Sequence, residues 1–193
     1  MTEVRLAEFE RPDLALLSHW LAQPHVARWW NDDPSPAAVD AQYGRSIDGL
    51  DRTDLFRIEL DSSPVGFLQR YPLADEDDYS RELSALIELM PGDHSIDYLI
   101  GDPTALRRGV GSFAVALAVA DLWASHPAAT RVLVPVHADN AASRRLLERA
   151  GFGMVAAGEL EPDNPIDSPQ HLIFAVERHA HASTQDRNGR MLP

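Results

Sequence analysis

An arginine- and glycine-rich segment lies between an expected strand and an expected apolar helix. It consists of Arg107, Arg108, Gly109, Val110, Gly111 and Ser112. A helix N-terminus presents free backbone N–H groups and binds anions well, and glycines let a phosphate approach the backbone closely. The segment therefore favours a phosphate site, although an ordinary turn with a charged rim has the same composition. It matches neither a P-loop nor a GxGxxG motif.

A second motif, NAASRRLLERAGF at residues 140–152, follows about thirty residues later. Together the two segments resemble the GCN5-related N-acetyltransferase (GNAT) superfamily, with its R/Q-x-x-G-x-G/A loop and its N-x-x-(A/S)…E-(K/R)-x-G-F helix. The resemblance implies acetyl-CoA as co-substrate, with its pyrophosphate bound by the 107–112 loop. It also implies that Asn140 and Ser143 contact acetyl-CoA. Leu106 stands at the usual Arg/Gln position, but backbone N–H groups should supply most of the binding.

Three further stretches make the resemblance more specific. WLAQPHVARWW at 20–30, PVGFLQRY at 64–71 and SIDYLIG at 95–101 are similar to segments of the aminoglycoside 6'-N-acetyltransferases. The similarity extends over nearly the whole chain, to about residue 178. A related branch, the siderophore N-acyltransferases that act on hydroxylysine-type amines, shares the tryptophan-rich stretch and the loop. That branch usually carries a characteristic His-containing strand, and we identify no counterpart of that strand in this sequence.

The resemblance also implies a site for the acceptor amine. Asp97 is expected to contact the amine as the catalytic residue, and the other expected substrate-binding residues are Trp29, Trp30, Gln69, Tyr71 and Asp78. Clustered carboxylates would bind several ammonium groups through charge-assisted hydrogen bonds. Each feature also has a purely structural interpretation: paired tryptophans pack in cores, a strand aspartate faces solvent, and acidic runs form solvated loops.

The expected chemistry is direct attack of an amine on the thioester, because the chain has no cysteine and no serine in a nucleophile elbow. Backbone N–H groups around Leu99 and Ile100 would polarise the carbonyl oxygen. An ordinary aspartate, with a pKa of about 3.9, is a weak base for an ammonium. Asp97 is therefore expected to orient the amine and to pass its proton to water.

Two positions depart from the family pattern. Leu147 replaces a tyrosine that in many GNAT enzymes protonates the departing thiolate, and Pro135 replaces an aspartate. A thiol of pKa about 8.5 needs little acid assistance, so the first loss is compatible with activity. His137 is either a substitute acid or incidental. The alternatives to aminoglycoside acetylation are acyl transfer to a siderophore-type or other natural amine and a non-catalytic acetyl-CoA-binding module.

The composition of the chain limits the kinds of molecule that it is expected to bind. The chain has 193 residues and a formal net charge of −13, which disfavours nucleic acid and favours a cationic small molecule. It has no apolar run that would span a membrane and no basic, apolar signal at the N-terminus, so a cytoplasmic protein is expected. No metal site is predicted, because cysteine is absent and the histidines form no ligand cluster outside the tail. A monomer or a homodimer is expected.

The periodicity of apolar residues predicts one domain over residues 1–178 and a disordered tail over residues 179–193. Strands are expected at 4–9, 54–60, 65–71, 95–100, 131–136, 153–157 and 171–176. Helices are expected from Pro12 onward and at 36–50, 81–89, 113–124 and 140–150. This order favours an α/β (α+β) protein with helices on both faces of one sheet. The resemblance specifies a GNAT fold with a single mixed, mostly antiparallel sheet.

Overall fold

A seven-stranded mixed sheet runs through the centre of the protein, in a computed structural model that describes residues 3–178. The strands are β1 (Val4–Glu8), β2 (Asp54–Leu60), β3 (Ser63–Pro72), β4 (Asp93–Ile100), β5 (Arg131–His137), β6 (Gly153–Glu159) and β7 (Gln170–Glu177). Their order across the sheet is β1-β2-β3-β4-β5-β7-β6. All neighbours are antiparallel except β4 and β5, which are parallel. The expected fold class is confirmed, and the predicted tail lies outside the described residues.

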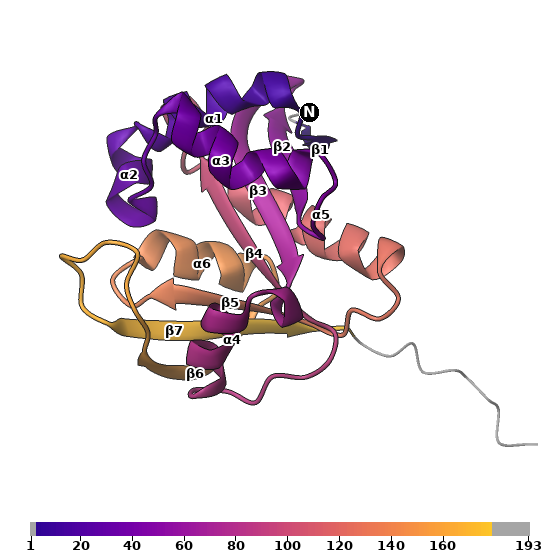
Figure 1. The fold of residues 1–193 in the computed structure, drawn as a ribbon, viewed down its shortest axis with the longest axis vertical. Helices are drawn as coiled ribbons and strands as arrows, with labels where there is room; N and C mark the ends of the chain where they lie inside the picture. Colours follow the sequence, from indigo (N-terminus) through magenta and orange to yellow (C-terminus); the bar gives the residue numbers. More distant parts are fainter. Residues whose placement is uncertain (1–2, 179–193) are drawn as a thin grey trace, which may run out of the picture.

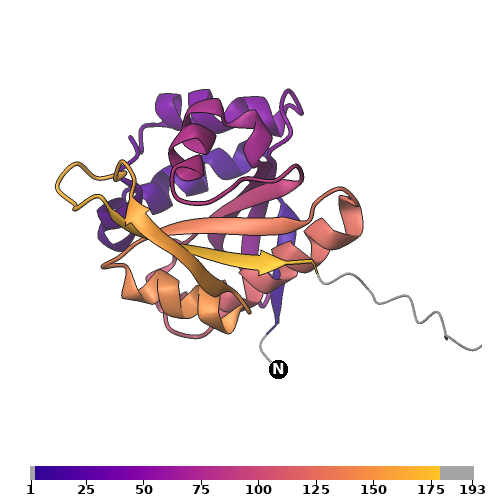
Figure 2. The same ribbon diagram turned by 90° about the horizontal axis from the view of Figure 1, so that it is seen from below.

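Helices cover both faces of this sheet, as Figure 2 shows from below. They are α1 (Leu14–Leu21), α2 (Pro24–Trp30), α3 (Pro36–Ile47), α4 (Asp77–Ser84), α5 (Val110–Ser125) and α6 (Ala141–Arg149). One core packs α5 and α6 against the sheet, and a second packs α1 to α3 on the opposite face. A third core joins α4 to β5 and β7. No helix within residues 3–178 is long and apolar enough to cross a membrane.

The two halves of the sheet separate between β4 and β5. Only two residue pairs join these strands, Asp93 with Arg131 and His94 with Val132. Beyond His94 the strands diverge, and Figure 1 shows β2 to β4 running steeply while β5, β6 and β7 run nearly horizontally. The backbone of β4 from Ser95 to Ile100 therefore has a strand partner only on its β3 side. This separation opens the sheet at its centre.

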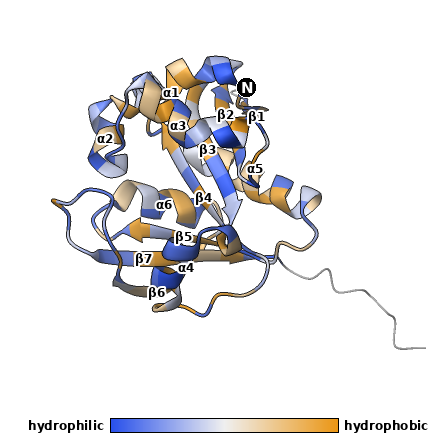
Figure 3. Cartoon of the chain, viewed as in Figure 1, coloured by the Kyte–Doolittle hydropathy of each residue, from blue (hydrophilic) through white to orange (hydrophobic). Residues whose placement is uncertain are grey.

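The helices differ from the sequence-based prediction at four places, one of which is the end of α3 at Ile47 rather than at residue 50. Residues 24–30 form a separate helix, α2, which begins at Pro24, where a missing N–H is tolerated. α4 covers Asp77–Ser84 rather than 81–89, because acidic residues favour its first turn; it is the hydrophilic helix in Figure 3. α5 begins at Val110, three residues before the predicted start. The N–H groups of the glycine-rich segment therefore belong to the first turn of that helix.

The end of β4 packs directly against α1 through a glycine. A Cβ atom on Gly101 would lie 2.0 Å from Cγ of Trp20, whose side chain is buried. The contact ties the α1–α3 layer to the strand that carries Asp97 and Tyr98. Only a residue without a side chain permits this approach.

We expect Gly101→Ala to lower the free energy of unfolding by about 2 kcal/mol, because α1 must shift to accommodate the methyl group. Urea denaturation measures the change. Gly153→Ala is the matched control, since an added Cβ there has no atom within 4 Å. An equal effect of both substitutions would show that the Trp20 contact is not the cause.

Candidate active site

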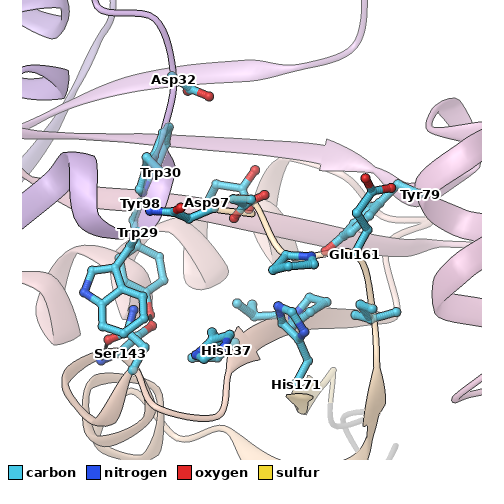
Figure 4. Close-up of a pocket in the computed structure, with 18 of the residues that line it drawn as sticks. Trp29, Trp30, Asp32, Tyr79, Asp97, Tyr98, His137, Ser143, Glu161 and His171 are labelled. Atoms are coloured by element: carbon cyan, nitrogen blue, oxygen red, sulfur yellow. Dashed lines mark hydrogen bonds between the residues drawn. The ribbon is translucent and has the colours of Figure 1, made fainter. Parts of the chain in front are cut away.

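A cavity of about 370 Å³ lies where β4 and β5 separate. Its walls come from α2, α3, β3, α4, β4, β5, the start of α6 and the loop between β6 and β7. Successive residues of β4 point to opposite faces of the sheet. Because both Asp97 and Tyr98 line the cavity, it reaches the two faces through the opening between the strands. Figure 4 shows these residues with the other labelled side chains of the cavity.

The carboxylate of Asp97 is held in place by its neighbour on β3. Gln69 lies opposite Asp97 in the register of β3 and β4, and its Nε2 donates a hydrogen bond of 2.7 Å to Oδ2. Desolvation raises the pKa of Asp97 above its usual range, and hydrogen bonding by Gln69 and Tyr71 opposes that shift. A carboxylate with a raised pKa and little solvation gains most from an ammonium partner.

Five further carboxylates line the same cavity: Asp32, Glu82, Glu161, Asp163 and Asp167. Desolvation, followed by repulsion from Asp97 and Asp32, raises the pKa of Asp163 to about 6. The pKa of Asp32 is also raised, chiefly by desolvation, with a contribution from Asp97. No lysine or arginine within residues 3–178 is among the lining residues. Arg28 pairs with Asp167 from outside the lining, and the other lining carboxylates form no ion pair within residues 3–178, so the cavity concentrates negative charge from several elements.

Aromatic side chains form much of the wall. Trp30 packs against the α1–α3 core, with its ring 6.2 Å from that of Phe67. Trp29 instead reaches across to β5, where its ring lies 5.8 Å from that of His137. Both tryptophans line the cavity, so their pairing serves the site as well as the core. Tyr71 lines it as well.

The loop between β6 and β7 closes one side of the cavity and is attached to α2. Arg28 forms a bidentate ion pair with Asp167, at 2.6 and 2.7 Å. Asn31 donates a hydrogen bond of 3.1 Å to the carbonyl of Asp163, and the guanidinium of Arg28 stacks on Trp29. These contacts join segments more than a hundred residues apart. No motif within residues 160–169 signals this wall, so sequence reasoning missed Glu161 and Asp163.

The opposite end of the opening fits a phosphate-bearing ligand. Gly109 has a φ of 82° and precedes α5, and Phe113 makes the first intrahelical hydrogen bond, back to Gly109. The N–H groups of Val110, Gly111 and Ser112 therefore lie in the first turn, where an anion binds well. Arg107 and Arg108 are exposed and form no ion pair within residues 3–178.

The expected cofactor residues of α6 and β4 lie next to this opening. Asn140 caps α6 by accepting the N–H of Ser143 at 3.0 Å. The hydroxyl of Ser143 is hydrogen-bonded to that of Tyr98 at 2.6 Å. Leu99 is buried, and the carbonyl of Ile100 is hydrogen-bonded to His25 at 2.9 Å.

One expected substrate residue lies elsewhere, and the two departures have different positions. Asp78 is outside the cavity: its side chain is 95% exposed and pairs with Arg81, because Tyr79 and Glu82 occupy the face of α4 that turns inward. Of the two departures, Leu147 is fully buried in the core, whereas Pro135 lines the cavity. His137 lines the cavity, where its Nε2 lies 2.9 Å from the carbonyl oxygen of Ser168.

Comparison with known proteins identifies the family. A family model described as an acetyltransferase (GNAT) domain matches residues 10–160. The chain belongs to the GNAT family. Acetyl-CoA is the co-substrate of this GNAT protein. The strand separation, the first turn of α5 and two arginines that form no ion pair in the described part of the chain suit an extended thioester with a pyrophosphate.

Solved structures similar to this GNAT chain include an aminoglycoside acetyltransferase. Aminoglycoside acetyltransferase AAC(6')-Ib in complex with coenzyme A superposes with a TM-score of 0.77 at 26% identity, covering 91% of this chain and 95% of that one. The same enzyme with paromomycin and acetyl-CoA gives 0.78 at 25%, covering 96% and 99%.

The curated relatives are lysine N-acyltransferases named MbtK. The protein from Mycolicibacterium paratuberculosis is 28% identical over 148 residues, which cover 72% of this chain and 60% of that protein. The protein from Mycobacterium tuberculosis is 25% identical over 139 residues, covering 72% and 63%. The GNAT chain thus spans less than two thirds of the length of these relatives.

We expect Asp163→Asn to stabilise the free protein at pH 7.5, because a carboxylate with a raised pKa opposes folding once it is ionised. The gain should be about 1 kcal/mol, reduced by the solvent exposure of this residue. This gain in unfolding free energy should shrink as the pH falls from about 6 toward 4, because the Asp163 carboxyl of the folded wild-type protein is then already protonated. Urea denaturation at several pH values measures it. A gain that is the same at pH 4 would contradict the electrostatic cause.

Proposed function

We propose that this protein acetylates a primary amine of a polycationic small molecule, in the manner of aminoglycoside 6'-N-acetylation. The observation that carries the proposal is the charge of the cavity: six carboxylates line it, only Asp167 among them has an ion-pair partner within residues 3–178, and no lysine or arginine of that range is among the lining residues. An acceptor with several ammonium groups satisfies these carboxylates as charge-assisted hydrogen bonds. Trp29 and Trp30 supply apolar walls for the rings of such an acceptor.

The same charge argues against a lysine-type acceptor, the second candidate. Lysine and hydroxylysine carry a carboxylate, which would lie among acids with no cation to bind it. The relationship to the lysine N-acyltransferases supports the acyl-transfer chemistry. Lysine and hydroxylysine are therefore included in the assay described below. The acidic surface of the whole chain, with a net charge of −13, also attracts polycations.

In the proposed reaction Asp97 binds and orients the attacking amine. Its raised pKa makes it a better proton acceptor than an ordinary aspartate, and Gln69 keeps the carboxylate fixed. Asp32 and Asp163 bind other ammonium groups of the acceptor at the rim. When bound, acetyl-CoA supplies the activated acetyl group. The β4 backbone and the first turn of α5 hold the thioester and the pyrophosphate.

Neomycin and paromomycin test the acceptor directly, because they differ in carrying an amine or a hydroxyl at the 6' position. Thiol release from acetyl-CoA should be rapid with neomycin, far slower with paromomycin and near background with lysine or hydroxylysine. Turnover of lysine or hydroxylysine in preference to neomycin would favour the siderophore-type reaction. Binding of coenzyme A without turnover of any amine would indicate a non-catalytic module.

We expect Asp97→Asn to lower kcat/KM for neomycin by about 100-fold or more, because the variant loses both the charge and the proton acceptor. Steady-state thiol release measures the change. The control is Glu8→Gln, which removes one carboxylate from the exposed side of β1. Unchanged turnover in Asp97→Asn would remove this residue from the mechanism.

We expect neomycin to bind about tenfold more weakly at pH 5 than at pH 7, because a carboxylate of pKa about 6 is neutral at the lower pH. The ammonium groups of neomycin keep most of their charge over this range. Isothermal titration calorimetry gives the two dissociation constants. Asp163→Asn should bind more weakly at pH 7 and lose most of the pH dependence; a full pH dependence in that variant would assign it to another group.

A further inference from the structure

The hydroxyl of Tyr98 lies at the point where the two faces of the sheet communicate. Tyr98 follows Asp97 on β4, so its side chain points to the face covered by α5 and α6, and its ring packs against their core. Its hydroxyl is hydrogen-bonded to that of Ser143, in the first turn of α6, at 2.6 Å. The pair thus spans the opening between β4 and α6, on the side of the sheet opposite the carboxylate of Asp97.

This position is next to the path of the thioester. The pyrophosphate site at the first turn of α5 and the acceptor site at Asp97 lie on opposite sides of the separated strands. A thioester that connects them must place its carbonyl carbon near Asp97 and its sulfur on the side of α5 and α6. Tyr98 and Ser143 both line the cavity on that side, whereas Leu147 is buried in the core and has no polar group.

The tyrosine is also in the right protonation state to donate. Desolvation raises the pKa of Tyr98 above its ordinary value, and the hydrogen bond with Ser143 opposes this only in part. The hydroxyl therefore keeps its proton throughout the neutral range. A phenol in this state is a hydrogen-bond donor to an anion rather than a strong acid.

We propose that Tyr98 is a catalytic residue whose hydroxyl, positioned by Ser143, donates a hydrogen bond to the coenzyme A sulfur as the carbon–sulfur bond breaks. The amine nitrogen forms the new bond to the carbonyl carbon, the electron pair of the broken bond stays on sulfur, and the nitrogen proton passes to Asp97 and then to water. Tyr98 retains its own proton, and the released thiolate takes one from water. The inference rests on the use of acetyl-CoA and is independent of the acceptor.

Binding of coenzyme A and of desulfo-coenzyme A, which lacks the sulfur, tests this without any acceptor. The thiol of coenzyme A has a pKa of about 8.5, taking a cysteine side chain as the model, so it is largely a thiolate at pH 9.5. In the wild type the ratio of the two dissociation constants should favour coenzyme A increasingly from pH 7 to pH 9.5. Tyr98→Phe should reduce that preference about tenfold at pH 9.5 and little at pH 7, because the lost hydrogen bond is to a charged group.

Two further variants make the result specific. Tyr43→Phe removes a phenol hydroxyl from another wall of the same cavity, beside Asp32, and should keep the wild-type ratio at both pH values. Ser143→Ala leaves the Tyr98 hydroxyl without its partner and should give an intermediate ratio. An unchanged ratio in Tyr98→Phe at pH 9.5, or equal weakening of both ligands, would overturn the assignment and leave Tyr98 a packing residue. Neither result bears on which amine is acetylated.

Discussion

The site depends on the failure of β4 and β5 to stay paired beyond His94. Parallel strands normally continue side by side, because unpaired backbone groups in a sheet are costly. Here two residue pairs hold the strands together and the rest of the β4 edge is left without a strand partner. A sheet that is opened in this way offers backbone donors and acceptors to an extended ligand, and it connects the two faces that the helices otherwise keep apart.

The two faces of the sheet suit ligands of opposite charge, and this difference indicates which face binds the acyl donor and which binds the acceptor. The face with α5 and α6 presents a helix N-terminus and two arginines without ion-pair partners in the described part of the chain, which suits an anion. The other face presents carboxylates from the α2–α3 loop, α4, β4 and the β6–β7 loop, which suits a cation. In the proposed reaction the anionic acyl donor and the cationic acceptor therefore meet at the opening, where Asp97 and Tyr98 are adjacent residues on opposite sides.

The acidic wall is costly to the free protein and useful to the complex. Asp32, Asp97 and Asp163 all have raised pKa values, with desolvation as the first cause, so each ionised carboxylate opposes folding in the free protein. An ammonium group bound among them removes that cost. The ion pair of Arg28 with Asp167 fixes the loop that carries Asp163, so the negative charge is organised before the acceptor binds.

Local sequence determined much of this protein. Apolar stretches located all seven strands, with period-two alternation at 4–9 and 54–60. The loop at 107–112 with the motif at 140–152 indicated the family and its co-substrate through their resemblance to GNAT enzymes. The tryptophan pair and Asp97 were also recognisable, since they lie within continuous motifs. The bounds of α4 and the separate helix α2 were missed, although Pro24 and the acidic first turn of α4 are local signals for where these helices begin.

Tertiary structure alone decided which carboxylates face the acceptor. Asp78, in the most conspicuous acidic run, turns to solvent beside Arg81, whereas Glu161 and Asp163 join the cavity from a loop with no motif. The role proposed for Tyr98 likewise depends on a hydrogen bond with Ser143, 45 residues away in sequence. Sequence spacing records neighbours along one strand or helix, but the charge of a cavity is the sum over elements that meet only after the chain has folded.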